Sequence, residues 1–402
     1  MRSRTAMFDN RFAILVLVLS LFGILMVYSS SAHFAEQYIG DSLFYFKRQL
    51  LWLVISLIGG SCAYLFGYRR LIELSPIILA VSIILLVAVL FLPEVRNVHR
   101  WIKIGSINFQ PSEMARIALI LFFAMILPKQ IKALENFKTY MILVGGALLV
   151  GGLIMIEPDI GTTLSLIVSL GLILFLAGSR KTHLAVTIAV AVVGISVLIF
   201  GLGYERSRID EYFLGLENPY DSQYQVLQGL LAIGSGGIFG TGLGIGGQKL
   251  LFLPEPHSDF IFASIAEETG ILITLPLITV FLLLFLRGCK IASKCQDKSG
   301  MLAAFGLSAL VATSAFINIG VVLGVLPVTG LPLPFVSYGG SSLLFNMIAV
   351  GIILSVSKAN SNALLMEKTG FGGYNFRRRR NWRSHIPGVS YRKPAYKRSP
   401  KR

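Results

Sequence analysis

About ten long apolar runs divide this chain, and they constrain its fold more than any other feature. A helix needs about 20 apolar residues to cross the hydrocarbon of a bilayer. Runs near that length lie at 12–28, 50–67, 71–92, 113–127, 139–156, 161–178, 183–203, 260–286, 301–325 and 341–356. Charged residues make up only 14% of the chain, whereas soluble proteins carry about 25%. The sequence therefore predicts an all-α, polytopic integral membrane protein with about ten transmembrane helices.

Three of these runs need separate comment. The fourth and the last are short, so we expect them to extend into flanking polar residues or to pack inside the bundle. The first run is too long for a signal-peptide core and lacks a small-residue cleavage site. It therefore predicts a helix that stays in the membrane.

Basic residues in the short loops predict the orientation of the helices, because cytoplasmic loops carry an excess of Lys and Arg. A cytoplasmic N-terminus places four internal basic clusters on the same side: Arg69–Arg70, Lys129 with Lys132 and Lys138, Arg180–Lys181, and Arg287 with Lys290, Lys294 and Lys298. An even number of spans returns the C-terminus to the cytoplasm as well. The pair Lys47–Arg48, on the outer side in this scheme, is the one mild exception.

The end of the chain differs in composition from the rest. From residue 358 onward it carries thirteen basic residues against one glutamate, and so holds most of the formal charge of +16. We expect a membrane domain at 1–357 and a disordered, basic cytoplasmic tail at 358–402. Such a tail could bind nucleic acid, but beside a membrane contact with anionic lipid is the better interpretation, so no nucleic-acid partner is expected.

Two predicted outer loops are long and not apolar, at 93–112 and at 204–258, the second of them before the eighth helix. Loops longer than about 15 residues are usually functional or disordered. The second loop is rich in glycine and aromatic residues, which favours an ordered structure. Its middle, 227–247, suits a short re-entrant or interfacial helix with a flexible turn. No internal repeat is visible, which argues weakly against inverted-repeat transporters.

The segment LPEPHSDFIFASIAEETG at 253–270 is the most informative stretch for function, because it sets four acids against a hydrophobic helix. Carboxylates at a bilayer are costly and usually functional. Asp259 lies where the loop becomes a helix, so it could be an N-cap. It could equally be a general base that removes a proton from a sugar hydroxyl. The two roles are compatible, and the sequence leaves both open.

Other loop-to-helix junctions carry charged residues with two possible roles. Glu113 and Arg116 are three apart on one helical face and form either an intrahelical ion pair or a substrate contact. Asp159 is expected to cap the sixth helix. Arg206 and Arg208 could hold phosphate or lie on a solvated loop surface. Backbone donors at Gly339, Gly340 and Ser341 could cradle an anion.

Several enzyme classes lack their signatures in this chain. We find no Walker loop, no HExxH pair and no GxSxG elbow in a convincing context, which argues against ATP hydrolysis, zinc proteolysis and serine hydrolysis. The three cysteines, Cys62, Cys289 and Cys295, have no metal-ligand or disulfide spacing.

Taken together, these stretches resemble the SEDS family (shape, elongation, division and sporulation), which includes FtsW and RodA. The resemblance covers 12–357 and leaves the tail unmatched. It rests on RW at 100–101, QPSE at 110–113, PDIGT at 158–162, YQVLQ at 224–228, AIGSGGIFGTGLG at 232–244, LPEPHSDFIFA at 253–263 and LPFVSYGGSS at 333–342. One departure is Arg116, where the family usually has Lys, and the two cations are not equivalent. The motifs VYSSS at 27–31, GGQK at 246–249 and LPEPH at 253–257 resemble the division branch, although a sporulation paralogue would be much the same.

The resemblance implies a peptidoglycan glycosyltransferase of the bacterial plasma membrane that acts at the division septum. Its substrate would be lipid II, and its partners a class B penicillin-binding protein and other divisome membrane proteins. Asp259 maps onto the essential aspartate of the family. The candidate substrate-binding residues are Arg100, Glu113, Arg116, Asp159, Arg206, Arg208, Lys249, Glu255, His257, Ser337, Gly339, Gly340 and Ser341.

In the reaction that the resemblance implies, an α-linked donor gives a β-linked product. This requires inversion, so one displacement and one base, Asp259, suffice. Arg206, Arg208, Lys249 and Arg116 are candidates to stabilise the departing pyrophosphate, and a divalent cation, Mg²⁺ or Mn²⁺, could share that task. Three alternatives remain: a lipid II flippase, a RodA-type elongation polymerase and a non-catalytic scaffold. The acids and ordered loops gather on the outer face with no matching inner constellation, which favours the enzyme.

Overall fold

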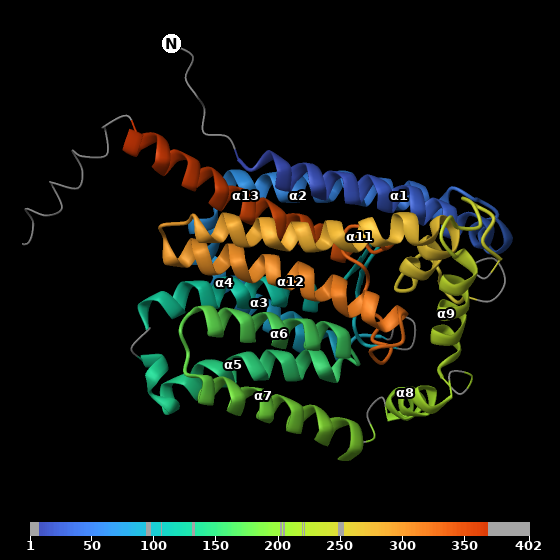
Figure 1. The fold of residues 1–402 in the computed structure, drawn as a ribbon. Helices are drawn as coiled ribbons and strands as arrows, with labels where there is room; N and C mark the ends of the chain where they lie inside the picture. The colour runs from blue at the N-terminus through green and yellow to red at the C-terminus, as the bar shows by residue number, and fades with distance from the viewer. Residues whose placement is uncertain are drawn as a thin grey trace, which may run out of the picture.

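The protein is described by a computed structural model that covers residues 8–368, apart from 94–97, 106, 131–132, 202, 204–205, 219, 221 and 248–252. Ten apolar helices within these described residues form one bundle (Figure 1). They are α1 (Asn10–Ile39), α2 (Phe44–Phe66), α3 (Tyr68–Val89), α4 (Pro111–Ile126), α5 (Phe137–Ile156), α6 (Ile160–Leu176), α7 (Lys181–Ser196), α11 (Ile261–Ser293), α12 (Lys298–Val322) and α13 (Gly340–Lys368).

Nine of the described helices are long and apolar enough to cross a membrane, and α6 is a shorter apolar helix. This confirms the predicted fold class. The two runs expected to extend do so, because a 3-10 turn at Leu127–Lys129 continues α4 and because α13 runs on to Lys368. Both helices are also largely buried in the bundle. A π-helical turn at Val197–Gly201 ends α7.

Helices α12 and α13 are the most buried spans and α7 is the least buried, so the centre of the bundle lies around α12 and α13. Small residues let α13 approach α2 closely: a methyl group at Gly351 would lie 2.1 Å from the backbone oxygen of Gly60. Such close backbone approach is typical of helix pairs in membranes, where dispersion contacts must replace the hydrophobic effect.

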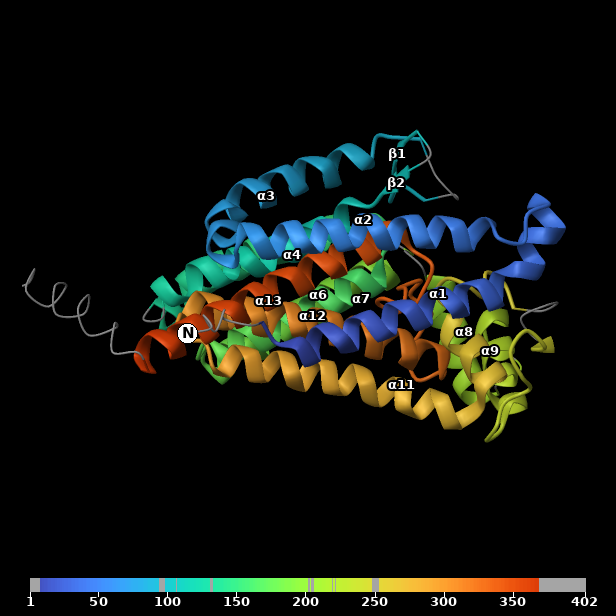
Figure 2. The same cartoon turned by 90° about the horizontal axis from the view of Figure 1, so that it is seen from above.

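The remaining described elements gather at one end of the bundle. They are a two-stranded hairpin of β1 (Ile102–Ile104) and β2 (Ile107–Phe109), and the helices α8 (Arg206–Glu217) and α9 (Tyr224–Gly236) (Figure 2). The hairpin is a small departure from the all-α prediction. Helix α9 and the glycine-rich turn after it correspond to the helix expected within 227–247.

The turn after α9 pairs with a break in α11. Gly270 has a φ of 63°, in the left-handed region that favours glycine, and interrupts the helix. The backbone nitrogen of Ile271 donates to the oxygen of Gly237 at 3.0 Å, and that of Thr241 donates to the oxygen of Glu267 at 2.9 Å. These bonds tie the predicted second loop to the helix that follows Asp259.

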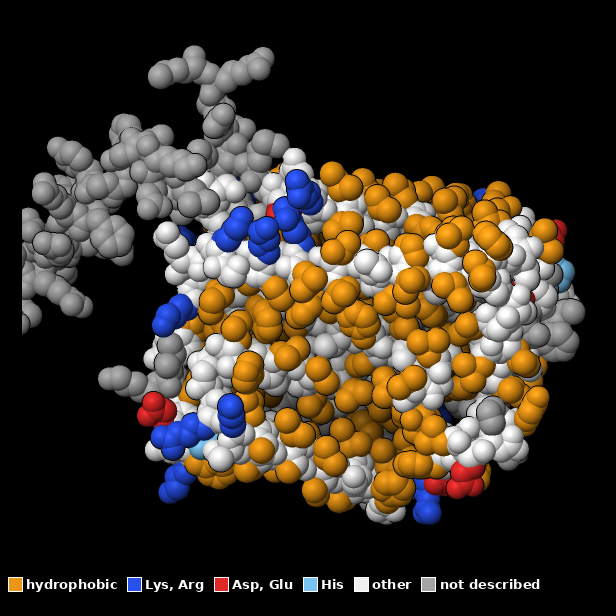
Figure 3. All heavy atoms as spheres, in the orientation of Figure 1, with side chains coloured by type: hydrophobic (Ala, Val, Ile, Leu, Met, Phe, Trp, Pro, Cys, Tyr) orange, Lys and Arg blue, Asp and Glu red, His pale blue; other side chains and the backbone are white. Residues whose placement is uncertain are grey.

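The start of α1 and the end of α13 lie together at the end opposite α8 and α9 (Figure 1). Apolar side chains cover the middle of the visible face, and most of the visible Lys and Arg side chains lie toward the end with α1's start (Figure 3). An apolar band with basic residues gathered toward one end is the distribution expected for a protein that spans a bilayer.

Candidate active site

A cavity of about 290 Å³ opens at the end of the bundle that carries the hairpin and the segment before α11. Five parts of the chain line it: α2, the hairpin region, the turn between α5 and α6, the loop after α12, and the start of α13. The segment that includes Asp259 completes it. Seven of the candidate residues line this cavity: Arg100, Asp159, Glu255, His257, Asp259, Gly339 and Gly340.

Asp259 lies beside the cavity and does not cap the helix that follows it. The N-cap of α11 is Phe260, and no side chain makes a cap hydrogen bond there. The carboxylate instead accepts a hydrogen bond of 2.7 Å from the Ser258 hydroxyl at Oδ1. Asn318 on α12 donates from Nδ2 to the backbone oxygens of Asp259 and Leu331, both at 2.7 Å. The capping role that spacing allowed is therefore absent, and the carboxylate remains available for chemistry.

Burial raises the pKa of Asp259 above the usual range of a carboxyl group. The Ser258 hydrogen bond acts in the opposite direction, and the nearby Glu255 carboxylate adds to the rise. Arg208 on α8 lowers the pKa through its charge. A general base is most effective when its pKa lies near the working pH. The surroundings of Asp259 move its pKa in that direction.

Arg100 and Asp259 approach the same point of the loop after α12. A methyl group at Gly330 would lie 3.9 Å from Arg100 Nη1 and 3.9 Å from Asp259 Oδ2. Gly330 has a φ of 67°, so it provides both the left-handed turn and the space between the two charged groups. The Nε of Arg100 donates to the backbone oxygen of Glu157 at 2.6 Å, which fixes the guanidinium at the cavity.

Behind Arg100, the turn between α5 and α6 holds two acids with different roles. Asp159 caps α6 as expected: its Oδ1 accepts from the nitrogen of Thr162, and its Oδ2 accepts from Nε2 of Gln110, both at 3.0 Å. Glu157 is fully buried, and its carboxyl oxygens have no hydrogen-bond partner among the described residues. Burial, with the charge of Asp159, raises the pKa of Glu157 to about 9. Glu157 is therefore protonated at neutral pH.

The start of α13 forms another wall of the cavity. Gly339 and Gly340 line it, and a methyl group at Gly340 would overlap the ring of Trp52. The hydroxyl of Ser341 donates to the backbone oxygen of Asn108 at 2.9 Å and so ties the helix to the hairpin. The first turn of a helix has backbone N–H groups without helical partners, which favours a bound anion.

Six of the candidate residues that the structure describes do not line the cavity. Arg116 and Glu113 form a buried ion pair within α4, the alternative to a substrate contact, and Arg116 Nη1 also donates to Ser165 at 2.9 Å and Ser314 at 3.2 Å. Arg206 is exposed and pairs with Asp210 at 3.4 Å.

The other described candidates outside the cavity are Arg208, Ser337 and Ser341. Arg208 lines a smaller cavity of about 100 Å³ between α8 and α9. The hydroxyls of Ser337 and Ser341 make hydrogen bonds to the backbone, and that of Ser337 accepts from the nitrogen of Leu333 at 2.8 Å. Lys249 lies outside the described residues.

Comparison with known proteins shows which family has this architecture. Residues 9–362 match the family described as "Cell cycle protein", which comprises FtsW, RodA and SpoVE. The chain belongs to the FtsW/RodA/SpoVE family. A relative from Geobacter metallireducens named "Probable peptidoglycan glycosyltransferase FtsW" is 37% identical over 87% of this chain and 94% of its own. "Stage V sporulation protein E" of Bacillus subtilis is 38% identical over 87% of this chain and 97% of its own.

Solved structures of the family share the fold. A chain of a peptidoglycan synthase complex, solved to study how polymerization and crosslinking are coordinated, has a TM-score of 0.70 and 28% identity over 88% of this chain and 98% of its own. The rod shape determining protein RodA of Thermus thermophilus has a TM-score of 0.63 and 26% identity over 88% of this chain and 97% of its own. The family resemblance inferred from the motifs is thus confirmed.

Several cavity residues of this FtsW/RodA/SpoVE member were not among the sequence-based candidates. Trp52, Ser258 and Gly330 line the cavity but carry no signal of their own in the sequence. Glu157, behind the cavity and not in its lining, was not a candidate either. Arg48 also lines the cavity and did have a signal, because a cation on the outer side breaks the charge rule used for orientation.

Proposed function

We propose that this chain is a peptidoglycan glycosyltransferase that polymerises lipid II into glycan strands. The observation that carries the proposal is the approach of Asp259 and Arg100 to Gly330 in the cavity at the end of the bundle that carries the hairpin. A carboxylate with a raised pKa and a guanidinium fixed in the same cavity suit a reaction that removes a proton and releases a pyrophosphate. The names of the relatives support the same activity.

The proposed reaction is a single inverting displacement. The 4-hydroxyl oxygen of the acceptor sugar attacks C1 of the donor, and the bond from C1 to the pyrophosphate oxygen breaks. Asp259 takes the proton of the hydroxyl, and the bonding electrons leave with the undecaprenyl pyrophosphate. Arg100 and the N–H groups at the start of α13 would stabilise this developing charge, since fixed donors act strongly in a site shielded from water. Arg48, on another wall of the same cavity, is a further cation for this task.

This assignment changes which cations hold the leaving group. Arg116 is buried against Glu113, and Arg206 is exposed beside Asp210. Neither lines the cavity, so Arg100 and Arg48 replace them in the mechanism. Arg208 retains an electrostatic effect on Asp259. Lys249 stays a candidate on sequence grounds alone.

A divalent cation fits the chemistry of this site. No three His, Cys, Asp or Glu side chains gather as a ligand set among the described residues. Mg²⁺ is nevertheless commonly bound by one or two carboxylates together with substrate phosphates. Glu255, which lines the cavity beside Asp259, would supply such a carboxylate and leave Asp259 as the base. When bound, the ion would neutralise charge on the departing pyrophosphate.

The division-type motifs and the FtsW names of several relatives support a role in cell division. We propose that the chain acts in septal wall synthesis, in the plasma membrane, with both termini in the cytoplasm. A class B penicillin-binding protein would crosslink the strands that it makes. The basic tail after residue 368 lies outside the described residues, and a role in contact with lipid stays a prediction.

The test is polymerisation of labelled lipid II by the purified protein with its crosslinking partner. We expect Asp259→Asn to lower the rate about 100- to 10,000-fold, because an amide cannot accept the proton. Asp210→Asn, at an exposed carboxylate on α8, is the matched control and should leave the rate nearly unchanged. Both variants should run as folded protein in size-exclusion chromatography.

Other outcomes would contradict parts of the proposal. Glycan synthesis by Asp259→Asn above about a tenth of the normal rate would place the base elsewhere, with Glu255 as the next candidate. If the wild-type protein moved lipid II across the membrane of vesicles but made no polymer, that result would instead support the flippase alternative.

A further inference from the structure

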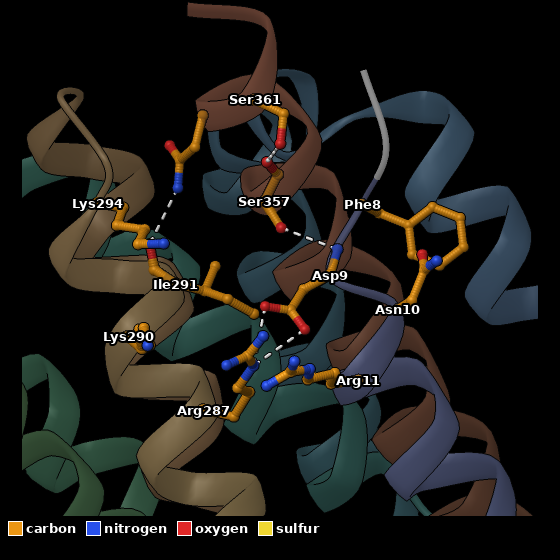
Figure 4. Close-up of a pocket in the computed structure, with 11 residues that line it drawn as sticks. Phe8, Asp9, Asn10, Arg11, Arg287, Lys290, Ile291, Lys294, Ser357 and Ser361 are labelled. Atoms are coloured by element: carbon orange, nitrogen blue, oxygen red, sulfur yellow. Dashed lines mark hydrogen bonds and ion pairs between the residues drawn. The ribbon is translucent and has the colours of Figure 1, made fainter. Parts of the chain in front are cut away.

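A second charged cavity, of about 360 Å³, lies at the opposite end of the bundle, where α1 begins and α11 and α13 end (Figure 4). Four cations line it: Arg11 from α1, and Arg287, Lys290 and Lys294 from α11. Lys290 and Lys294 follow Arg287 by three and seven positions, so the three side chains of α11 lie on one face of the helix. Among the residues that the structure describes, Asp9 is the one acid that lines this cavity.

Asp9 is engaged in contacts that hold the helices together. Its Oδ1 accepts from the nitrogen of Phe12 at 3.0 Å, and its two oxygens lie 3.1 and 3.0 Å from Nε of Arg287 (Figure 4). Its backbone nitrogen donates to Ser357 on α13 at 3.1 Å. Arg11, Lys290 and Lys294 have no carboxylate partner within the described part of the chain. The cavity therefore carries a net positive charge and suits an anion.

An apolar groove of about 370 Å³ adjoins this basic cavity. It is lined by α1, α2 and α13, with side chains such as Leu17, Leu57 and Leu354. Phe8 lines both the groove and the basic cavity, so the two spaces share a wall. Its ring packs edge-on against Tyr64, with centroids 5.7 Å apart. The basic cavity and the apolar groove therefore form one composite site on the flank of the transmembrane helices.

We propose that this composite site binds an anionic phospholipid of the cytoplasmic leaflet. The phosphate would lie among Arg11, Arg287, Lys290 and Lys294, because guanidinium and ammonium groups recognise phosphate oxygens. An acyl chain would occupy the groove beside Leu17. Basic pockets between transmembrane helices at the cytoplasmic side are well suited to anionic lipid headgroups. The site lies at the other end of the bundle from the candidate active site and is independent of the proposed reaction.

The test measures binding of fluorescent phosphatidylglycerol and phosphatidylcholine to the full-length protein in neutral detergent micelles. Wild type should prefer phosphatidylglycerol. The double variant Lys290→Gln/Lys294→Gln should bind it about 25-fold more weakly, since each basic residue near an anionic surface contributes about fivefold. The control Lys138→Gln/Lys181→Gln removes the same charge from exposed lysines at the starts of α5 and α7, and should bind like wild type. Both pairs are exposed, so neither should disturb the fold.

A second variant distinguishes a lipid from a free anion. Leu17→Trp fills the groove at a side chain that is 43% exposed. This substitution should weaken the binding of phosphatidylglycerol but leave competition by inorganic phosphate unchanged. Wild-type binding of phosphatidylglycerol by Lys290→Gln/Lys294→Gln would overturn the proposal. An equal loss of binding in this variant and in the Lys138→Gln/Lys181→Gln control would also overturn it. Leu17→Trp could instead keep wild-type affinity for phosphatidylglycerol while inorganic phosphate competes fully. That result would assign the cavity to a soluble anion and would also refute the proposal.

Discussion

The hydroxyl of Ser258 donates a hydrogen bond of 2.7 Å to Oδ1 of Asp259, the next residue in the chain. The same hydroxyl lies 3.3 Å from Oε2 of Glu255, so it stands between the two carboxylates of this segment. It lowers the pKa of Asp259 against the larger effect of burial. In the proposed mechanism, Ser258 therefore extends toward lower pH the range in which Asp259 is ionised and can act as a base.

Ser258→Ala should raise the pKa of Asp259 further, because it removes the donor that favours the ionised form. A base works only when deprotonated, so the acid limb of the kcat/KM profile should move to higher pH. The loss of activity should then be larger at pH 6 than at pH 8. Ser258→Thr retains the hydroxyl and should keep the wild-type profile. An unchanged acid limb in Ser258→Ala would show that this hydrogen bond does not tune the base.

Arg100→Gln should reduce lipid II polymerisation by about 100- to 1,000-fold in kcat, the usual effect of removing a fixed donor to a developing negative charge. Arg206→Gln provides a matched control at a cation that is 58% exposed and paired with Asp210. Such surface pairs contribute about 0–1 kcal/mol, so its rate should change only slightly. Similar losses in the two variants would indicate that Arg100 has no special place in the reaction.

Glu157→Gln should change how stability depends on pH. The pKa of Glu157 in the folded protein is about 9, above its ordinary value of 4.5. Between these values the folded chain keeps a proton that the unfolded chain releases, so stability is greatest at low pH and falls as pH rises toward 9. Gln does not titrate and should remove this component.

The measurement is the apparent Tm in detergent at pH 5 and pH 9. The decrease should be smaller for Glu157→Gln than for wild type. Glu135→Gln, at a carboxylate that is 69% exposed, should retain the wild-type decrease. The same decrease in all three proteins would mean that Glu157 is ionised in the folded state.

Arg116→Met should destabilise the protein by about 3–5 kcal/mol, because it leaves the buried Glu113 without its cation. The double variant Glu113→Leu/Arg116→Met removes both charges and should regain most of that stability. Thermal unfolding in detergent provides the comparison through a double-mutant cycle. If the double variant is no more stable than Arg116→Met, the Arg116 bonds to Ser165 and Ser314 matter more than the ion pair.

Much of the fold followed from local pattern. Apolar runs predicted the transmembrane helices because a backbone in hydrocarbon must satisfy its hydrogen bonds within its own segment. Even the small differences were local. Helix α6, at Ile160–Leu176, has no continuation like those of α4 and α7 and so stays short for a membrane span, and the loop at 93–112 contains a hairpin. Asp159 was expected to cap α6 from its position alone, and it does.

The candidate site depended far more on tertiary structure. The motifs identified Asp259, but spacing could not decide between a helix cap and a base, because that choice depends on the backbone geometry at Phe260. Nothing in the sequence placed Arg100 against the turn at Glu157, or Gln110 within 3.3 Å of Ser341, 231 positions away. Likewise, the basic cavity at the other end appeared in the sequence only as scattered topology signals. Helix periodicity and hydrophobic length act within one segment and are legible in the sequence, whereas these contacts arise only when separate helices pack, since packing sets which side chains share a cavity.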